Sequence, residues 1–221
     1  MAKKREPFLR ALDVIRTNML KGVYPPAQPI VIADEARRLG LSTTPIREAL
    51  SCLCGEGLVE RGPCGGFVAP RFDAGALRDR YEFRLTCLLA ALDLTADLPG
   101  YRRRSRTDAT AAPDLQRIFE DVVRRSGNAV LLAAYQRVGV QLRQVLEAER
   151  IVFIDVDIEA DRIKVLADEG APQAFCEALR THHHRRIRAA PHIAAEIARR
   201  GAASAHGLDE VPLASPTGEP C

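Results

Sequence analysis

The sequence predicts a mainly α-helical fold that contains one short β-hairpin in the first third of the chain. Apolar residues recur every three or four positions over most of the sequence, which is the spacing of amphipathic helices. Residues 58–61 and 66–69 instead alternate in the period of strands, and a Gly-rich turn separates them. With 221 residues, the chain is long enough for two domains that each bury a core.

The composition narrows the classes of protein. No apolar run reaches the roughly 20 residues that span a bilayer, and the N-terminus lacks a hydrophobic signal core. We therefore expect a cytoplasmic protein without a membrane partner. The six cysteines are spaced irregularly, unlike those of a zinc ribbon or a small disulfide framework, so reduced thiols are expected.

The net charge of +3 lies entirely in the N-terminal part of the chain. Residues 1–70 contain ten Lys and Arg against seven Asp and Glu, whereas the remainder is balanced. A surplus of this size is compatible with a nucleic-acid partner and equally with an ordinary solvated surface.

The N-terminal third is expected to begin with a loose basic arm over residues 1–7. An amphipathic helix follows from Phe8 to about Gly22, where the glycine caps it. Residues 23–28 contain two prolines and are predicted to form a turn and a short extended connection. A second helix is expected over residues 31–39.

A tight turn from Gly40 to Ser42 leads into a third helix, which is predicted to end near Cys54. A hydroxyl within residues 42–44 can cap this helix at its N-terminus. The apolar positions of the helix fall on one face: Ile46, Ala49, Leu50 and Leu53. Arg47 and Ser51 therefore point away from the expected core.

Two helices joined by a tight turn and followed by a hairpin form the outline of a winged helix-turn-helix. In this arrangement the first residues of the second helix meet base edges in the DNA major groove, and the helix amides hold phosphate. The string LGLSTTPIREALSCLCGEGLVERGPCGGFVAP, residues 39–70, resembles the winged helix-turn-helix of the GntR family of bacterial transcription regulators. The matching positions are Leu39, Gly40, Ser42, Thr44, Pro45, Arg47, Glu48, Ala49, Leu50, Leu53, Glu56, Gly57, Leu58, Val59, Gly65, Phe67 and Val68.

The resemblance implies DNA contacts from seven residues: Ser42, Thr43, Thr44, Arg47, Arg37, Cys64 and Gly65. Two of them depart from the family pattern, because Thr43 and Cys64 stand where an arginine usually touches DNA. Arg47 is retained, and its guanidinium can pair bidentately with guanine. The alternative for Arg47 is a surface ion pair with Glu48 or Asp34. The two missing cations predict weaker and less salt-dependent binding, unless other basic residues compensate.

After Pro70 the sequence is predicted to form an all-helical bundle, whose first helix Asp73 can cap. Helices are expected at about residues 74–96, 113–125, 129–150, 159–169, 172–188 and 191–200. Residues 151–158 alternate like a strand but are predicted to connect two helices, because no strand partner is evident. Residues 101–113 are expected to form an exposed basic loop. The expected domains are a DNA-binding domain over 1–70, a helical effector-binding and dimerisation domain over 71–205, and a disordered tail over 206–221.

Three features of the second half carry a further resemblance: Arg84, the SGN junction at residues 126–128, and a helix that ends near His182. They resemble the FCD domain, the effector-binding bundle of the FadR subfamily. The resemblance implies an effector site with the residues Arg84, Asn128, His182 and His183. Many FCD domains bind a metal, but Leu115 and Phe119 occupy two of the ligand positions here and offer no donor atom.

We therefore expect no metal and no cofactor. A more apolar pocket would suit a small organic effector such as an organic acid, with Arg84 or an imidazole facing its carboxylate. Two alternatives stay open. One is that Arg84 pairs structurally with a neighbouring acid, and the other is a metal site rebuilt from Asp114, Glu120, Asp161 and His192.

These observations favour an effector-responsive transcription regulator that binds double-stranded DNA as a homodimer at a two-half-site operator. We expect a repressor rather than an activator. The chain shows no Ser-His-Asp signature, no Gly-rich phosphate loop and no HExxH motif, so no enzyme is expected. The alternative is a small-molecule-binding or metal-binding helical protein with enzymatic activity at the His182–His184 cluster.

Overall fold

The computed structural model describes residues 2–96, 114–169 and 171–206, and these residues are mainly helical, as predicted. They form the helices α1 (Ala2–Leu20), α2 (Ile32–Leu39), α3 (Thr43–Glu56), α4 (Ala74–Thr95), α5 (Leu115–Arg125), α6 (Ala129–Arg143), α7 (Leu146–Val152), α8 (Val156–Glu169) and α9 (Pro172–His206), and the strands β1 (Glu60–Arg61) and β2 (Phe67–Val68). None of the helices in these ranges is long and apolar enough to cross a membrane.

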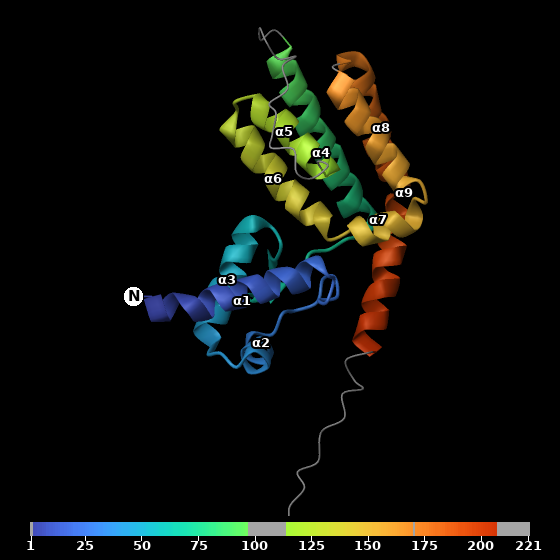
Figure 1. Cartoon of the computed structure of the whole chain (residues 1–221). Coiled ribbons are helices and arrows are strands. Elements are labelled where there is room, and N and C mark those ends of the chain that lie inside the picture. Colours follow the sequence, from blue (N-terminus) through green and yellow to red (C-terminus); the bar gives the residue numbers. More distant parts are fainter. Residues whose placement is uncertain (1, 97–113, 170, 207–221) are drawn as a thin grey trace, which may run out of the picture.

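Residues 2–69, which we call the head, form a winged helix-turn-helix with its own core (Figure 1). α1 lies against α3, and their fully buried residues include Ile15, Ile46 and Leu50. Phe67 of β2 joins this core from the wing. The predicted apolar face of α3 is therefore confirmed, and the helix is fixed to the head along its length.

Helices α4 to α9, which we call the bundle, stand side by side above the head in Figure 1. α4 and α9 pack along each other, and α5, α6, α7 and α8 surround them. The predicted cap of α4 is confirmed, since the Asp73 side chain accepts a hydrogen bond from the Ala76 amide at 2.8 Å. α9 extends past the bundle, and its Gly201 reaches Pro26 of the head.

Several helix boundaries differ from the predictions, and two of the differences occur at prolines. The expected loose arm is wrong, because α1 begins at Ala2 and contains Pro7. A proline lacks one backbone donor. Only about one helical turn precedes Pro7, so the missing hydrogen bond lies near the start of the helix. The expected break before Pro191 is also wrong, because α9 is continuous. Ala190 and Ile193 on either side of that proline are fully buried in one core, and their packing outweighs the missing backbone hydrogen bond.

The helix predicted over residues 129–150 is divided into α6 and α7. Val145 lies at the division and is fully buried, so the chain turns there to bury it. The predicted connection over residues 151–158 contains no strand, but it is shorter than expected, because α7 ends at Val152 and α8 begins at Val156. The predicted basic loop at residues 101–113 and the tail after His206 lie outside the described residues.

The wing has a partner that the sequence did not indicate. β1 and β2 pair antiparallel with Glu60 opposite Val68, as the hairpin prediction requires. In addition, Pro29 forms an isolated bridge with Val68, and the Ile30 amide donates to the Phe67 carbonyl at 2.8 Å. The extended segment after α1 thus braces the wing from its second edge.

Candidate functional site

The N-terminus of α3 presents a polar, unobstructed surface. Gly40 adopts the left-handed conformation, with a φ of 63°, that lets the chain turn tightly between α2 and α3. Ser42 occupies the cap position without a capping hydrogen bond from its side chain. The side chains of Ser42, Thr43 and Thr44 are all exposed. The first turn of α3 therefore offers hydroxyl and amide donors to a ligand outside the protein.

Arg47 and Arg37 differ in their surroundings although both are exposed. Arg37 forms an ion pair with Asp34 at 3.1 Å. Within the described residues, Arg47 forms no ion pair or hydrogen bond with another side chain, so pairing with Asp34 or Glu48 is not observed. A guanidinium without a partner on the exposed side of α3 keeps all five of its donors available.

The wing places Cys64 and Gly65 at its exposed tip, where Gly65 has a φ of 87°. Sequence reasoning missed a third wing residue. The Arg61 guanidinium lies 4.3 Å from the centre of the Phe67 ring, and it donates to the Ser51 hydroxyl of α3 at 3.5 Å. Strand pairing contained a signal for this, because Arg61 and Phe67 are opposite each other. Arg61 thereby links the wing to the outer side of α3.

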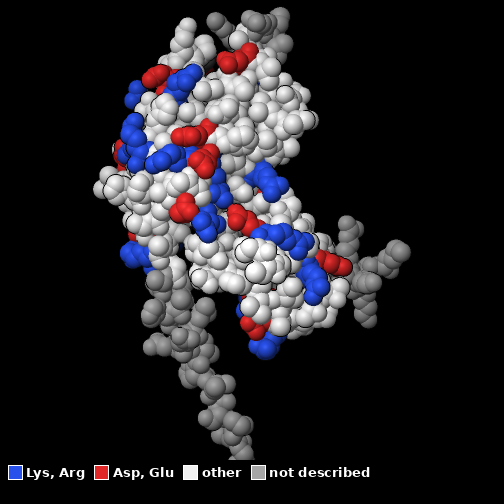
Figure 2. Space-filling model, turned by 180° about the vertical axis from the view of Figure 1, so that it is seen from behind, with Lys and Arg blue, Asp and Glu red and all other residues white. Residues whose placement is uncertain are grey.

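The surface charge is mixed. On the face that Figure 2 shows, Lys and Arg are interspersed with Asp and Glu over both the head and the bundle. A small surplus of positive charge in the head thus coexists with many local pairs of opposite charge.

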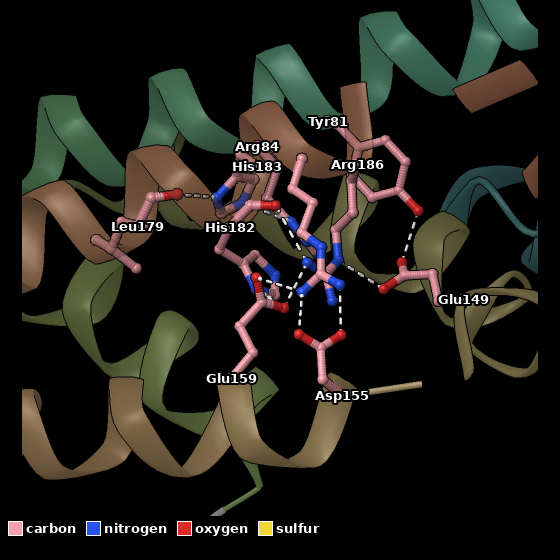
Figure 3. Close-up of polar contacts among 10 residues, drawn as sticks. Tyr81, Arg84, Glu149, Asp155, Glu159, Leu179, His182, His183 and Arg186 are labelled. Atoms are coloured by element: carbon pink, nitrogen blue, oxygen red, sulfur yellow. Dashed lines mark hydrogen bonds and ion pairs between the residues drawn. The ribbon is translucent and has the colours of Figure 1, made fainter. Parts of the chain in front are cut away.

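Inside the bundle, three of the four predicted effector residues come together. Arg84 from α4 and the neighbouring His182 and His183 from α9 are buried beside one another (Figure 3). Asn128 does not join them. Its side chain accepts hydrogen bonds from the amides of Val130 and Leu131 at 3.1 and 3.0 Å, so it caps α6 at an exposed position.

The contacts of His183 define its protonation. Nδ1 lies 2.7 Å from the Leu179 carbonyl, which can only accept, so Nδ1 carries the proton. Nε2 then accepts a hydrogen bond from Nε of Arg84 at 3.0 Å. Burial, together with the charge of Arg84, lowers the pKa of His183 well below its ordinary value. His183 is therefore neutral and polarised by the guanidinium.

His182 is held by an acid from another helix. Its Nδ1 donates to the Glu159 carboxylate of α8 at 3.1 Å, and the Phe119 ring stands edge-on at 5.3 Å between ring centres. Burial and the nearby Arg186 hold the pKa of His182 well below its ordinary value. Neither buried imidazole is therefore charged at neutral pH.

Arg186 of α9 is the centre of the buried polar cluster, which consists of Tyr81, Glu149, Glu159, His182 and Arg186. It donates to Glu149 and to Glu159, each at 2.7 Å. Glu149 also accepts from the Tyr81 hydroxyl at 2.6 Å. Burial alone would lower the pKa of Arg186, but the two carboxylates outweigh burial and raise it. One buried cation thus joins α4, α7, α8 and α9.

Arg84 has a different set of partners. Besides His183, it approaches the Gln116 side-chain oxygen at 3.5 Å and the rings of Tyr81 and Phe119 at 5.5 and 5.6 Å. No carboxylate of the described chain forms an ion pair with it, so the predicted alternative of a neighbouring acid is not observed. Arg84 is a buried cation whose polar partners are neutral.

The positions where the FCD resemblance expects metal ligands are filled by apolar packing. Leu115 and Phe119 are buried in the core of the bundle. In the described ranges, no three His, Cys, Asp or Glu residues gather in a way that could hold a metal ion. The alternative set is dispersed: Asp114 caps α5, Glu120 pairs with Arg124, Asp161 pairs with Lys164, and His192 is exposed.

Comparison with known proteins identifies similar solved structures. No protein-family model matches the chain, and no curated protein matches it. The chain resembles the structure of Lar from Listeria monocytogenes, described as controlling the expression of the agr system and mediating virulence. The identity is 14%, the TM-score is 0.51, and the match covers 87% of this chain and 96% of that chain.

Two further solved structures match with lower scores. McbR/YncC from E. coli is 16% identical with a TM-score of 0.45, over 92% of this chain and 99% of that chain. A transcriptional regulator described as a GntR family member, from Pseudomonas syringae pv. tomato str. DC3000, is 17% identical with a TM-score of 0.33, over 93% of this chain and 90% of that chain. At these identities, the likeness to Lar concerns the fold alone: a winged helix-turn-helix followed by a helical bundle.

Proposed function

We propose that this chain is a sequence-specific, DNA-binding transcription regulator of the GntR family, and that it is not an enzyme. The observation that carries the proposal is the surface at the N-terminus of α3. Three exposed hydroxyls and an unpaired Arg47 lie there, on a helix whose opposite face is fully buried. A rigid helix with free donors at its N-terminus suits the DNA major groove.

Each residue of this surface has a proposed role in binding DNA. Arg47 pairs with a guanine edge, and the hydroxyls of Ser42, Thr43 and Thr44 donate to phosphates or base edges beside it. Cys64 and Gly65 at the exposed tip of the wing approach the neighbouring DNA backbone. Arg37 contacts phosphate after exchanging its ion pair with Asp34.

We further propose that the bundle is an FCD-type domain of the FadR subfamily that dimerises the chain and binds a small organic acid. Arg84 supports this class of effector, because a buried cation with neutral polar partners favours an anionic ligand. His183 accepts a hydrogen bond from Arg84, and the ring of His182 lies 5.0 Å from that of His183. A homodimer presents two α3 helices to a two-half-site operator, and the proposed role is that of a cytoplasmic repressor.

Regulation follows from linkage between the two sites. An effector changes operator affinity only by the difference between its affinities for two arrangements of the heads. If binding at Arg84 favours the arrangement that does not fit the operator, the effector releases the DNA. The expected coupling is about 1–3 kcal/mol, which is roughly a 5- to 150-fold change in affinity.

Selection of bound DNA from a random pool tests the proposal most directly. We expect enrichment of a sequence with two related half-sites, separated by about one helical turn of DNA or a multiple of it. The Arg47→Ala variant serves as the matched control: it should remain folded and enrich a sequence that has lost its preference at one base position of each half-site. If the unaltered chain enriches no sequence from the pool, sequence-specific DNA binding is excluded, whether or not the chain dimerises.

A further inference from the structure

One face of α6 is turned toward the head rather than toward the bundle. Arg137, Val140, Gln141 and Gln144 follow the spacing 3, 1 and 3, which places them on one side of a helix. Val140 packs against the core of the head, whereas Tyr135, Val138 and Leu142 are buried in the bundle. α6 therefore belongs to the bundle by one side and contacts the head by the other.

The part of the head that meets this face is the C-terminal end of α3. Arg137 donates to the Gly55 carbonyl at 3.3 Å, and the last carbonyls of a helix carry the negative end of its dipole. Gly57 follows α3 so close to α6 that an added Cβ atom would lie 3.0 Å from the side-chain nitrogen Nε2 of Gln141 and 3.1 Å from Arg137 Cγ. The two helices are thus in direct contact at this point.

Arg80 of α4 makes a second link between the bundle and the head. Its guanidinium approaches the carboxylate of Glu60 at 3.4 Å, and Glu60 lies in β1 at the base of the wing. The same side chain donates to Gln141 of α6 at 3.2 Å and to the Ala76 carbonyl at 2.9 Å. Only 15% of the Arg80 side chain is exposed, so its position is well determined by these partners.

We infer that Arg80 and Arg137 are positioning residues, which hold the end of α3 and the base of the wing against the bundle and thereby set the half-site spacing that the dimer accepts. The inference rests on the proposed function and adds a structural basis for its regulation. Arg80 lies one helical turn before Arg84, so α4 connects the head contact directly to the proposed effector residue.

The geometry of α3 explains why such contacts would control spacing. With 14 residues, α3 is about 21 Å long, and the contacts are at its C-terminal end whereas the proposed DNA contacts are at its N-terminal end. A rotation of about 10° at the held end moves the other end by roughly 3.5 Å, which is about one base-pair step. Loss of the contacts should therefore weaken the preference for one spacing between the half-sites, without altering the half-site sequence that the protein recognises.

The experiment compares the full chain with an Arg80→Ala/Arg137→Ala variant on operators that share both half-sites but differ in spacer length. We expect the unaltered protein to prefer one spacing by at least tenfold, and the variant to bind neighbouring spacings within about threefold of one another. Affinity for a single half-site should change less than twofold. Arg80→Lys/Arg137→Lys should restore much of the preference, and Arg143→Ala, exposed on the same helix α6, is the matched control.

A second measurement does not depend on DNA. Trypsin can cut after Arg71, which is exposed, only if the buried Phe72 is released from the bundle. We expect the double alanine variant to be cut there several-fold faster than the unaltered chain and Arg143→Ala. If both the spacing profile and the cleavage rate stay unchanged, the positioning role is overturned. If the unaltered chain selects no DNA, the proposed function fails first, and the cleavage rates still report whether the contacts hold the head.

Discussion

Arg47 on α3 and Arg186 on α9 show two opposite uses of the same side chain. Arg47 is exposed and forms no ion pair within the described chain, and the helix beneath it is anchored by apolar residues. Arg186 is 1% exposed and is paired with Glu149 and Glu159. The Arg47 guanidinium is available to a partner outside the protein, whereas the Arg186 guanidinium is paired with carboxylates inside it.

The two arginines therefore have different expected roles, Arg47 in binding and Arg186 in the stability of the fold. Removing an exposed, unpaired cation leaves no buried charge behind, so the fold should tolerate it. Removing a member of the buried polar cluster leaves the opposite charge without its partner in a poorly solvated place. The predictions below test this contrast, beginning with the largest expected effect.

Glu149→Ala should destabilise the chain by about 3–5 kcal/mol, because Arg186 loses one of its two carboxylates and the Tyr81 hydroxyl loses its acceptor. Urea unfolding followed by circular dichroism measures the change. Asp161→Asn, which affects an exposed pair with Lys164, is the control and should stay within about 0.5 kcal/mol. A loss below about 1 kcal/mol for Glu149→Ala would mean that the buried pair is better solvated than its burial indicates.

Acidification should destabilise the bundle through His182 and His183. Their pKa values are lowered in the folded state, so the unfolded chain binds more protons once the pH falls below about 6.5. Stability is therefore constant above that pH and decreases below it, by about 2 kcal/mol in all between pH 7 and pH 5.5.

The matched variants are His182→Gln/His183→Gln and His184→Gln, since His184 is exposed on the same helix. The first should lose most of the pH dependence in this range, and the second should keep it. Equal slopes for the two variants would show that other groups cause the acid sensitivity. Unfolding free energies from urea titrations at several pH values provide the measurement.

Arg47→Ala should weaken binding to the selected operator by about 1–3 kcal/mol, or roughly 5- to 150-fold, and should relax specificity at one base position. The midpoint of thermal unfolding should change little, because the side chain is exposed and unpaired in the described structure. Fluorescence anisotropy with labelled operator measures the affinity. An unchanged affinity would remove Arg47 from the proposed interface.

Cys64→Arg should have the smallest effect of these variants, and it should strengthen DNA binding where Arg47→Ala weakens it. It places a cation at the exposed tip of the wing, where the GntR resemblance expects an arginine. We expect tighter binding at low salt, and the slope of log affinity against log salt should become steeper by about one. A slope identical to that of the unaltered chain would show that the tip of the wing lies away from the phosphates.

The winged helix-turn-helix was predictable because its signals are local. The apolar spacing of Ile46, Ala49 and Leu50, the left-handed Gly40 and the alternating hairpin each act over a few residues. The outward direction of Arg47 follows from the same spacing. The additional bridge from Pro29 to Val68 was not predictable in this way, because it joins segments that are distant in the sequence.

The sequence by itself determined where α2, α3 and the wing lie and which side of α3 is exposed, since helix periodicity and turn residues decide these features locally, whereas the start of α1 at Ala2 was not predicted. Only the tertiary structure decided that α9 continues through Pro191 and that Tyr81 meets Glu149, which is 68 positions away. It also decided that α3 rests on α6 through Gly57. The physical reason is that burial of side chains from distant segments in one core is a property of the packed chain, and it outweighs local preferences such as the tendency of proline to end a helix.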